Sequence, residues 1–356
     1  MVLHLNASKT KAVIFSKRKI SDKSVFTLNG EMLNVVDDFA YLGIMFMSNG
    51  SFSKNRVKLL EQGRKAMFSM LRKSLGLPID IQLQMFDTMI SPILLYGCEV
   101  WCFENNDAIE SLFLHFYKII LGVKKSTPNC ILYGELGRYR IEIFIKSRMI
   151  GLWKRLICNK PDKISAMLYK LLFTMHQWDI VHSKWICCIE NILNDCGYSE
   201  YWIAQNVTKN VYLSKNVKLR LCDQFKQKWS TVVFNSPKCL NYRIFKCNHG
   251  LEKYLLDLPD DLRKALCSFR CLNHRLPIER GRFWGVERDD RICDIRTSNV
   301  MGDEYHYLFE CSFFNNERKS LLPHNLTTKP NIDKFKELFN SDSYNIYCKI
   351  VLSVVN

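Results

Sequence analysis

Residues 39–46 form an apolar run of strand length, Phe-Ala-Tyr-Leu-Gly-Ile-Met-Phe, and this run most constrains how the chain begins to fold. Large apolar side chains in a short segment favour a strand, and the glycine within the run lets another backbone come close. Residues 11–16 form a second strand-like segment, and Asn29-Gly30 lies between the two. This dipeptide favours a tight hairpin turn, because such a turn needs positive φ at its central positions. We therefore expect a short N-terminal antiparallel β-meander.

From residue 51 onward the apolar residues recur at the spacing of amphipathic helices. Ser51 or Ser53 is a candidate N-cap for the first helix, and Pro92 should end or kink the second at Ser91. Residues 133–140 have the composition of a turn-rich passage. The expected helices cover 51–75, 81–91, 109–120, 141–158, 163–176, 183–195, 213–233, 260–272 and 332–339. The predicted fold class is α+β, mostly α, with helical bundles after the β-meander.

The chain carries 51 Lys and Arg against 35 Asp and Glu, a net charge of +16, which suits a polyanionic partner such as nucleic acid. The alternative is a basic protein with no such partner. Arginine forks suit phosphate oxygens especially well. The candidate contacts are Lys9, Lys11, Lys17, Arg18, Lys19, Arg263, Arg270, Arg275, Arg280, Arg282 and Arg291.

Both basic groups have another interpretation. Lysines beside a strand protect its edge from pairing with other chains. The arginines after residue 258 can instead form ion pairs with Glu279, Glu287, Asp289 and Asp290.

Fifteen cysteines occur at irregular spacing without a secretory signal, which favours reduced thiols inside a cell. Cys187-Cys188 lacks the spacing of a metal site and is expected to be buried thiol. No uncharged apolar run is long enough to cross a bilayer, so no membrane contact is expected. We expect an intracellular protein of the cytoplasm or nucleus.

Three sequence blocks follow one another at 5–15 (Leu-Asn-Ala-Ser-Lys-Thr-Lys-Ala-Val-Ile-Phe), 41–44 (Tyr-Leu-Gly-Ile) and 92–101 (Pro-Ile-Leu-Leu-Tyr-Gly-Cys-Glu-Val-Trp). In this order the chain resembles the downstream half of a non-LTR (LINE-type) retrotransposon reverse transcriptase. Blocks at 133–138, 276–282 and 302–311 extend the resemblance over most of the chain. It implies a palm end with a primer-grip-like hairpin at 1–50, a thumb-like bundle at 51–126 and a helical connector at 127–258. An Arg-rich helix with a zinc-knuckle-like segment would follow at 259–322, and a C-terminal tail at 323–356.

The resemblance implies binding of template–primer RNA and DNA, with Tyr41 and Gly43 of the hairpin among the contacts. The family's catalytic Asp-Asp motif would lie before Met1, so no catalytic residue is assigned and the chain is not expected to be an enzyme on its own. Mg²⁺ would be needed only in a full-length parent. Asp37-Asp38 imitates that motif, but we expect the pair to cap backbone donors at a turn. The alternative is a decayed or repurposed element product that acts as a helical scaffold.

Cys293 and a later His306-x4-Cys311 pair form a candidate metal site. Tetrahedral zinc needs four ligands. The resembling family often has Cys-x2-Cys here, but Arg296 stands where the second cysteine belongs. A fourth ligand would be water or one of Cys271, His274 and Asp294. We therefore expect the three residues to converge in a knuckle-like loop that holds zinc weakly or not at all, with aromatic residues of 305–314 packing in either case.

Overall fold

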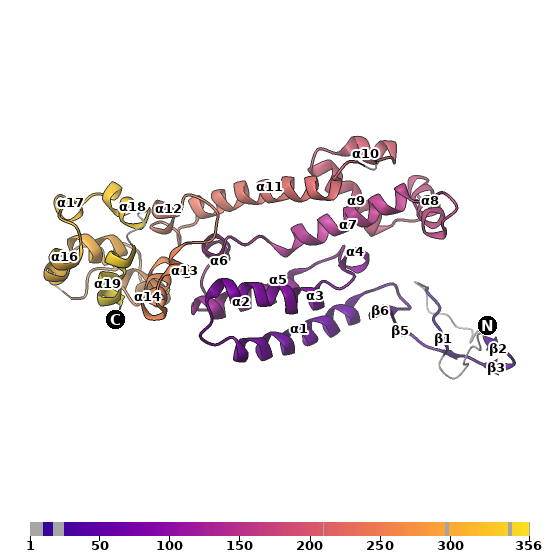
Figure 1. Cartoon of the computed structure of the whole chain (residues 1–356), viewed down its shortest axis with the longest axis horizontal. Coiled ribbons are helices and arrows are strands. Elements are labelled where there is room, and N and C mark those ends of the chain that lie inside the picture. Colours follow the sequence, from indigo (N-terminus) through magenta and orange to yellow (C-terminus); the bar gives the residue numbers. More distant parts are fainter. Residues whose placement is uncertain (1–9, 17–24, 209, 296–298, 341–343, 356) are drawn as a thin grey trace. The chain divides into compact units, whose positions relative to one another are not determined.

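The computed structural model describes residues 10–16, 25–208, 210–295, 299–340 and 344–355. These residues are mostly helical, and the short strands lie in the N-terminal part, so the predicted α+β, mostly α class is confirmed (Figure 1). The chain divides into two compact units. Unit 1 contains Met1–Leu75, Leu83–Ile109 and Ile145–Leu213, and unit 2 contains Gly76–Gln82, Glu110–Phe144 and Ser214–Asn356.

The strands of unit 1 form three separate pairs. β2 (Thr27–Leu28) pairs with β3 (Glu31–Met32) and β5 (Asp38–Tyr41) with β6 (Ile44–Met47), both antiparallel. β1 (Lys11–Ala12) pairs with β4 (Asn34–Val35) in parallel. The expected single antiparallel meander is therefore wrong in its pairing. The long segment between β1 and β4 contains its own hairpin, which lets the chain return in the same direction.

Two of these pairs are tight hairpins with positive φ at both turn residues. Asn29 and Gly30 have φ of 51° and 84°, which confirms the turn predicted from this dipeptide. Leu42 and Gly43 have φ of 47° and 85°. The apolar run 39–46 is therefore two strands joined by a two-residue turn rather than one strand.

The first helices of the chain pack against one another within unit 1. α1 (Ser53–Lys73) contacts the π-helical turn η1 (Phe86–Ile90) and α3 (Ser91–Leu94). The N-cap of α1 is Phe52, without a side-chain cap, so neither predicted serine holds that position. α2 (Ile79–Met85) leads into η1, and the helical path continues past Pro92 to Leu94 instead of stopping at Ser91. Proline has no N–H to bond to the preceding turn, and its ring would clash with the carbonyl of that turn in a regular α-helix. The wider π-helical turn η1 before Pro92 gives the ring room, so the chain stays helical.

The middle of the chain follows the predicted helices closely. α7 (Ile141–Cys158), α8 (Ile164–Gln177), α9 (Lys184–Asp195) and α11 (Leu213–Asn235) lie where the apolar spacing placed them, as does α5 (Asp107–Leu121). Two short helices were not predicted, α4 (Cys98–Trp101) and α10 (Ser199–Ala204).

Unit 2 contains a helix where a turn-rich passage was expected. α6 (Asn129–Leu136) ends at Gly137, whose φ of 61° suits a glycine. Most of α5 and α11 also lies in unit 2. The described helices that follow α11 along the chain are α12 (Tyr242–Phe245), α13 (Tyr254–Asp257), α14 (Asp260–Arg270), α15 (Pro277–Phe283), η2 (His306–Glu310), η3 (Ser312–Phe314), α16 (Asn315–Leu321), α17 (His324–Thr327), α18 (Ile332–Asn340) and α19 (Tyr344–Val355).

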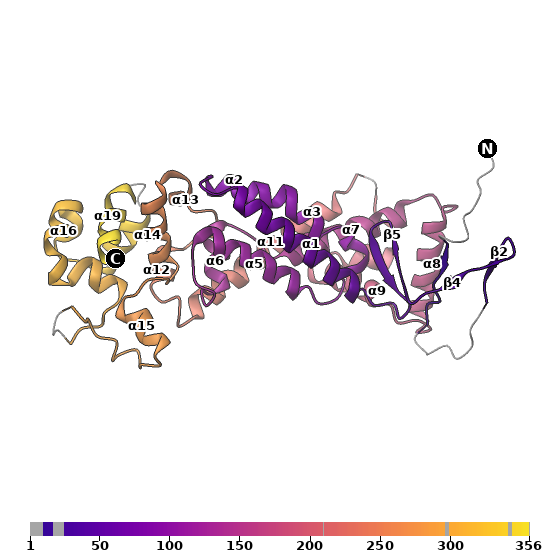
Figure 2. The ribbon, with the colours of Figure 1, turned by 90° about the horizontal axis from the view of Figure 1, so that it is seen from below.

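The last helix of unit 2 was also missed. The tail was expected to hold one helix at 332–339, which corresponds to α18. α19 is a second helix that packs along α14 (Figure 2). Its polar residues Asn345, Lys349 and Ser353 recur every four residues, so the spacing of an amphipathic helix is present in the sequence and was overlooked.

Candidate nucleic-acid interface and metal centre

The β5–β6 turn rests on Tyr96. The Tyr96 hydroxyl donates a hydrogen bond to the Leu42 carbonyl at 2.9 Å. A Cβ added at Gly43 would lie 3.1 Å from Cε1 of Tyr96, and one added at Gly97 would lie 2.6 Å from Cδ1 of Ile44. The close neighbour of Gly43 is thus an aromatic ring and not the expected backbone. These contacts join block 41–44 to block 92–101, two of the blocks that carry the resemblance.

The residues under the turn are held by partly buried hydrogen bonds and an ion pair. Trp101 is fully buried and donates from Nε1 to the Tyr96 carbonyl at 2.8 Å. Arg148 pairs with Glu99 at 3.1 Å and donates to the Leu95 carbonyl at 3.3 Å. The turn above this base exposes 61% of Tyr41 and 72% of Leu42. Unit 1 therefore presents an aromatic and an aliphatic side chain on a well-supported turn.

Asp37 and Asp38 hold the base of the same hairpin. Asp37 lies at the bend before β5, and its Oδ1 accepts a hydrogen bond from the Ser48 hydroxyl at 3.4 Å. Asp38 forms an ion pair with Lys54 in the first turn of α1. The predicted position at a turn is confirmed for Asp37, but the carboxylates bind side chains rather than the backbone donors expected.

α1 carries a basic stripe opposite its buried face. The buried residues are Asn55, Leu59, Gly63, Met67 and Met70. Lys54, Lys58, Lys65 and Arg72, four and seven residues apart, share the opposite side with one acid, Glu61, and are exposed or half-exposed. We name these four residues the α1 basic stripe. The spacing of these four residues relative to the apolar residues of 51–75 is enough to find the stripe from the sequence, yet none of them is among the predicted nucleic-acid contacts.

The basic residues predicted near the N-terminus are only partly placed. Lys11 lies in β1 and is exposed. Lys9, Lys17, Arg18 and Lys19 lie outside the described residues.

Most arginines after residue 258 hold the local structure of unit 2. Arg263 pairs with Asp260, Arg280 with Asp294 at 2.6 Å, and Arg282 with Glu279 at 2.8 Å. Arg291 donates to the carbonyls of Val286 and Ile278 at 2.7–3.0 Å. Arg275 and Arg280 keep exposed side chains. Much of this segment therefore fits the alternative in which the arginines form ion pairs within the protein. Of the four acidic partners expected for them, Glu279 forms such a pair.

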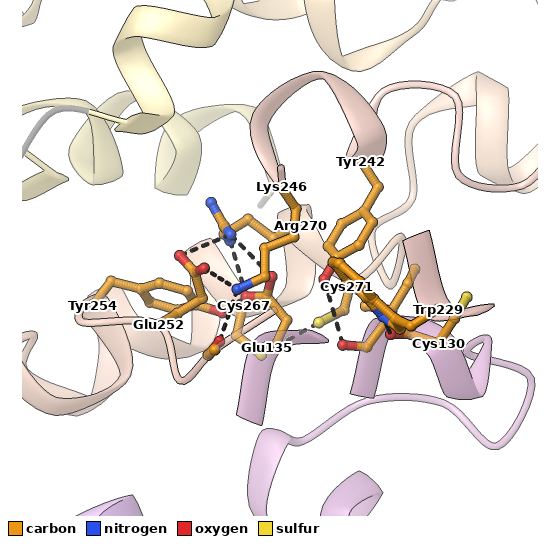
Figure 3. A network of polar contacts seen from close by, with 12 residues as sticks. Cys130, Glu135, Trp229, Tyr242, Lys246, Glu252, Tyr254, Cys267, Arg270 and Cys271 are labelled. Atoms are coloured by element: carbon orange, nitrogen blue, oxygen red, sulfur yellow. Dashed lines mark hydrogen bonds and ion pairs between the residues drawn. The ribbon is translucent and has the colours of Figure 1, made fainter. Parts of the chain in front are cut away.

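Arg270 is the centre of a buried network and is removed from the proposed contacts (Figure 3). It is 1% exposed, donates to both carboxylate oxygens of Glu135 at 2.9 Å, and pairs with Glu252 at 2.9 Å. The Tyr254 hydroxyl also donates to Glu135, at 2.7 Å. The guanidinium has no surface left for a phosphate, so its prediction as a nucleic-acid contact is wrong.

Charge pairing decides the ionisation of this network. Burial alone would raise the pKa of Glu135, but the charge and hydrogen bonds of Arg270 outweigh burial and lower it. Lys246 completes the network by pairing with Glu252 and donating to the Gly250 carbonyl at 2.8 Å. The network joins α6 to α14 and to residues 250–254, and its role is structural.

Cys293, His306 and Cys311 converge as predicted. Their ligand atoms lie within 4.8 Å of one another, and all three residues are buried. Glu310 lies 3.4 Å from His306 Nδ1, while His306 Nε2 is buried without a hydrogen-bond partner among the described residues. A histidine in a cluster with two thiols that has a carboxylate at one ring nitrogen and no partner at the other has the arrangement of a metal-binding histidine. The donor set thus fits zinc with one position unfilled.

The loop is also held by contacts that need no metal. Arg318 is buried and donates to the carbonyls of Tyr307 and Cys311, and Asp303 accepts from the His306 amide at 2.9 Å. Burial raises the pKa of the Cys311 thiol, so metal binding would have to displace a firmly held proton.

The suggested outside ligands are engaged elsewhere. His274 binds Glu304 at 3.0 Å, Cys271 lies 3.8 Å from the Cys267 sulfur, and Asp294 accepts from the Tyr307 hydroxyl at 2.7 Å. None of them belongs to the cluster found among the described residues. Arg296 lies outside those residues.

Comparisons of this chain with protein-family models, with curated proteins and with solved structures found no match. In the part of the chain that the structure describes, no helix combines the length and apolar character needed to cross a membrane.

Proposed function

We propose that this chain is the C-terminal portion of a retrotransposon-derived reverse transcriptase and binds template–primer RNA and DNA through phosphate contacts. The observation that carries the proposal is the contact of Tyr96 with the Leu42-Gly43 turn. Two blocks that are similar to one family support each other in one unit, through Leu42 and Tyr96, which lie 54 residues apart in the sequence. A chance likeness of short sequence blocks would not require such a contact.

The binding surface we propose combines this turn with the α1 basic stripe. β6 packs on α1, and the Asp38–Lys54 ion pair ties the hairpin to the start of that helix. Exposed lysine and arginine side chains neutralise phosphates and release counterions, whereas an exposed aromatic ring such as Tyr41 can stack on a base. Lys11, Arg275 and Arg280 remain further candidates, because their side chains are exposed.

The test measures binding of a labelled RNA–DNA hybrid to the full chain across a salt series. Affinity should fall steeply with salt, and the triple variant Lys58→Ala, Lys65→Ala, Arg72→Ala should bind more weakly and with a shallower slope. Each lost phosphate contact should reduce the slope of log K against log salt by about 0.7 to 0.9. Lys319→Ala, Lys336→Ala, Lys349→Ala changes the same number of exposed positive charges on unit 2 and should have a much smaller effect.

A helical scaffold without a nucleic-acid role is the second candidate. The observation in its favour is that Arg263, Arg270 and Arg282 are paired with carboxylates of the same unit. In that case the chain would show weak binding that is flat from low to moderate salt, and the two triple variants would behave alike.

A further inference from the structure

A second group of metal-binding side chains lies in unit 1, where α8 passes into α9. His176 is in the last turn of α8, His182 in the connecting loop, and Cys187 in α9. The Cys187 sulfur lies 4.0 Å from His176 Nε2 and 3.8 Å from His182 Nε2. All three donor atoms lie within 4.8 Å of one another. The expectation that Cys187 is plain buried thiol missed these two histidines.

The tautomer of His176 is set by a backbone carbonyl. His176 Nδ1 lies 3.3 Å from the Val181 carbonyl oxygen, which can only accept a hydrogen bond. Nδ1 therefore carries the proton, and Nε2 directs its lone pair towards Cys187. A histidine that donates its second ring N–H to a backbone carbonyl is held in the state in which it binds metal ions.

The separations are close to those of a coordinated ion. Zinc lies about 2.0–2.1 Å from nitrogen and about 2.3 Å from sulfur, so tetrahedral ligand atoms stand roughly 3.6 Å apart. The two sulfur–nitrogen separations exceed this value by a few tenths of an ångström. His182 lies on an exposed loop, so a rotation of its side chain can close the His182–Cys187 part of the difference.

We propose that His176, His182 and Cys187 bind Zn²⁺ or a similar borderline divalent ion, with the fourth position open to water. Two imidazoles and a thiolate suit such an ion better than Mg²⁺ or Ca²⁺, which prefer oxygen ligands. The thiol releases its proton to solvent when it binds. Because His176 and Cys187 are half-buried and His182 is exposed, an ion can enter without unfolding the unit. The site is independent of the proposed nucleic-acid binding.

Anaerobic titration of the reduced full chain with Co²⁺ tests the site, because a cobalt–thiolate bond gives a charge-transfer band in the near ultraviolet. His182→Ala and Cys187→Ser should each remove one equivalent of thiolate-bound cobalt, or weaken it more than about 100-fold, since a direct ligand should cost more than an outer-shell partner. Cys247→Ser and His324→Ala are matched controls at exposed positions and should leave the titration unchanged. Cys293→Ser distinguishes the two clusters. It should remove any cobalt bound by Cys293, His306 and Cys311 and leave the equivalent bound by His176, His182 and Cys187 in place.

A second measurement uses the unaltered chain, so its result does not depend on whether the variants fold. Alkylation of each cysteine is followed by mass spectrometry with and without Zn²⁺. Zinc should slow the modification of Cys187 at least tenfold and leave that of Cys247 unchanged. The proposal is overturned by equal alkylation rates of Cys187 with and without zinc, or by a full cobalt equivalent that survives both His182→Ala and Cys187→Ser.

Discussion

The guanidinium of Arg270 donates two parallel hydrogen bonds to the carboxylate of Glu135, a partner 135 residues earlier in the chain. Both side chains are fully buried. Two charges can stay buried only while they are paired, because each alone would face the cost of leaving water.

Removal of one charge from this pair should therefore be more harmful than removal of both. Glu135→Gln should lower the free energy of unfolding by about 3–5 kcal/mol, since it leaves Arg270 buried without its main counter-charge. The double variant Glu135→Leu, Arg270→Met should recover a large part of that loss. Urea unfolding measures both. Equal destabilisation by the single and the double variant would contradict this account.

The lowered pKa of Glu135 gives the stability of the chain a pH dependence with a defined sign. A carboxyl whose pKa is lowered by folding contributes stability above its unfolded pKa, and this contribution is lost as pH falls through the folded pKa. The unaltered chain should lose stability on acidification below about pH 4, the ordinary range of a glutamate. Unfolding midpoints measured between neutral and acid pH should fall less steeply in the double variant than in the unaltered chain. Parallel curves would show that Glu135 does not titrate in this way.

Two glycines with nearly the same backbone conformation allow the Tyr96 contact to be isolated. Gly43→Ala and Gly30→Ala both place a side chain at φ near 85°. An added Cβ at Gly43 meets the Tyr96 ring at 3.1 Å, whereas at Gly30 it meets no described atom within 4 Å. Gly43→Ala should raise hydrogen exchange throughout the β5–β6 hairpin and weaken binding of the RNA–DNA hybrid, and Gly30→Ala should affect only its own hairpin. Similar losses of binding in both variants would show that the contact of the β5–β6 turn with Tyr96 is not needed to bind the hybrid.

The purified chain should not extend a primer. Asp37 binds Ser48 and Asp38 binds Lys54, so both carboxylates are engaged in holding the hairpin. Incorporation of nucleotides with Mg²⁺ or Mn²⁺ should be absent in the unaltered chain and in the Asp37→Ala, Asp38→Ala variant alike. Incorporation that the double substitution abolishes would show that these residues are catalytic.

The Cys293, His306 and Cys311 cluster should gain zinc affinity when a fourth ligand is supplied. Arg296→Cys places a thiol at the position that the resemblance assigns to a ligand, and the affinity of the cluster for zinc should rise by orders of magnitude. Competition with a chelator in the full chain measures the change, with His176, His182 and Cys187 kept intact in both proteins. Equally tight zinc at this cluster before and after the substitution would mean that another residue or water already completes the site.

Features that depend only on a few neighbouring residues could be predicted from the sequence. The Asn29-Gly30 turn and the bounds of α7 depend on local preference and apolar spacing, and both occur as expected. Convergence of Cys293 with the His306–Cys311 pair was also foreseen, because the resemblance supplied the pairing that spacing alone does not.

Features that depend on distant partners were beyond local reasoning. Arg270 looks like a phosphate contact until its partner Glu135 is known, and Glu135 in turn lies in a helix whose residues suggested a turn. His176-x5-His182 falls within a spacing that is common at zinc sites, and His182-x4-Cys187 repeats the spacing of His306 and Cys311. The spacing could therefore have marked these residues, but it does not show that all three converge. Their approach depends on how α8 and α9 turn back on each other.

The order in which a ribosome makes the chain gives the Glu135–Arg270 pair a further consequence. At about 5 to 20 residues per second, Arg270 emerges roughly 7 to 27 s after Glu135, since 135 residues separate them. During that interval the nascent α6 carries a carboxylate that lacks its main counter-charge and that water must solvate. Unit 2 can therefore close around this carboxylate only after translation has passed α14, and until then the apolar side chains of α6 are available to chaperones.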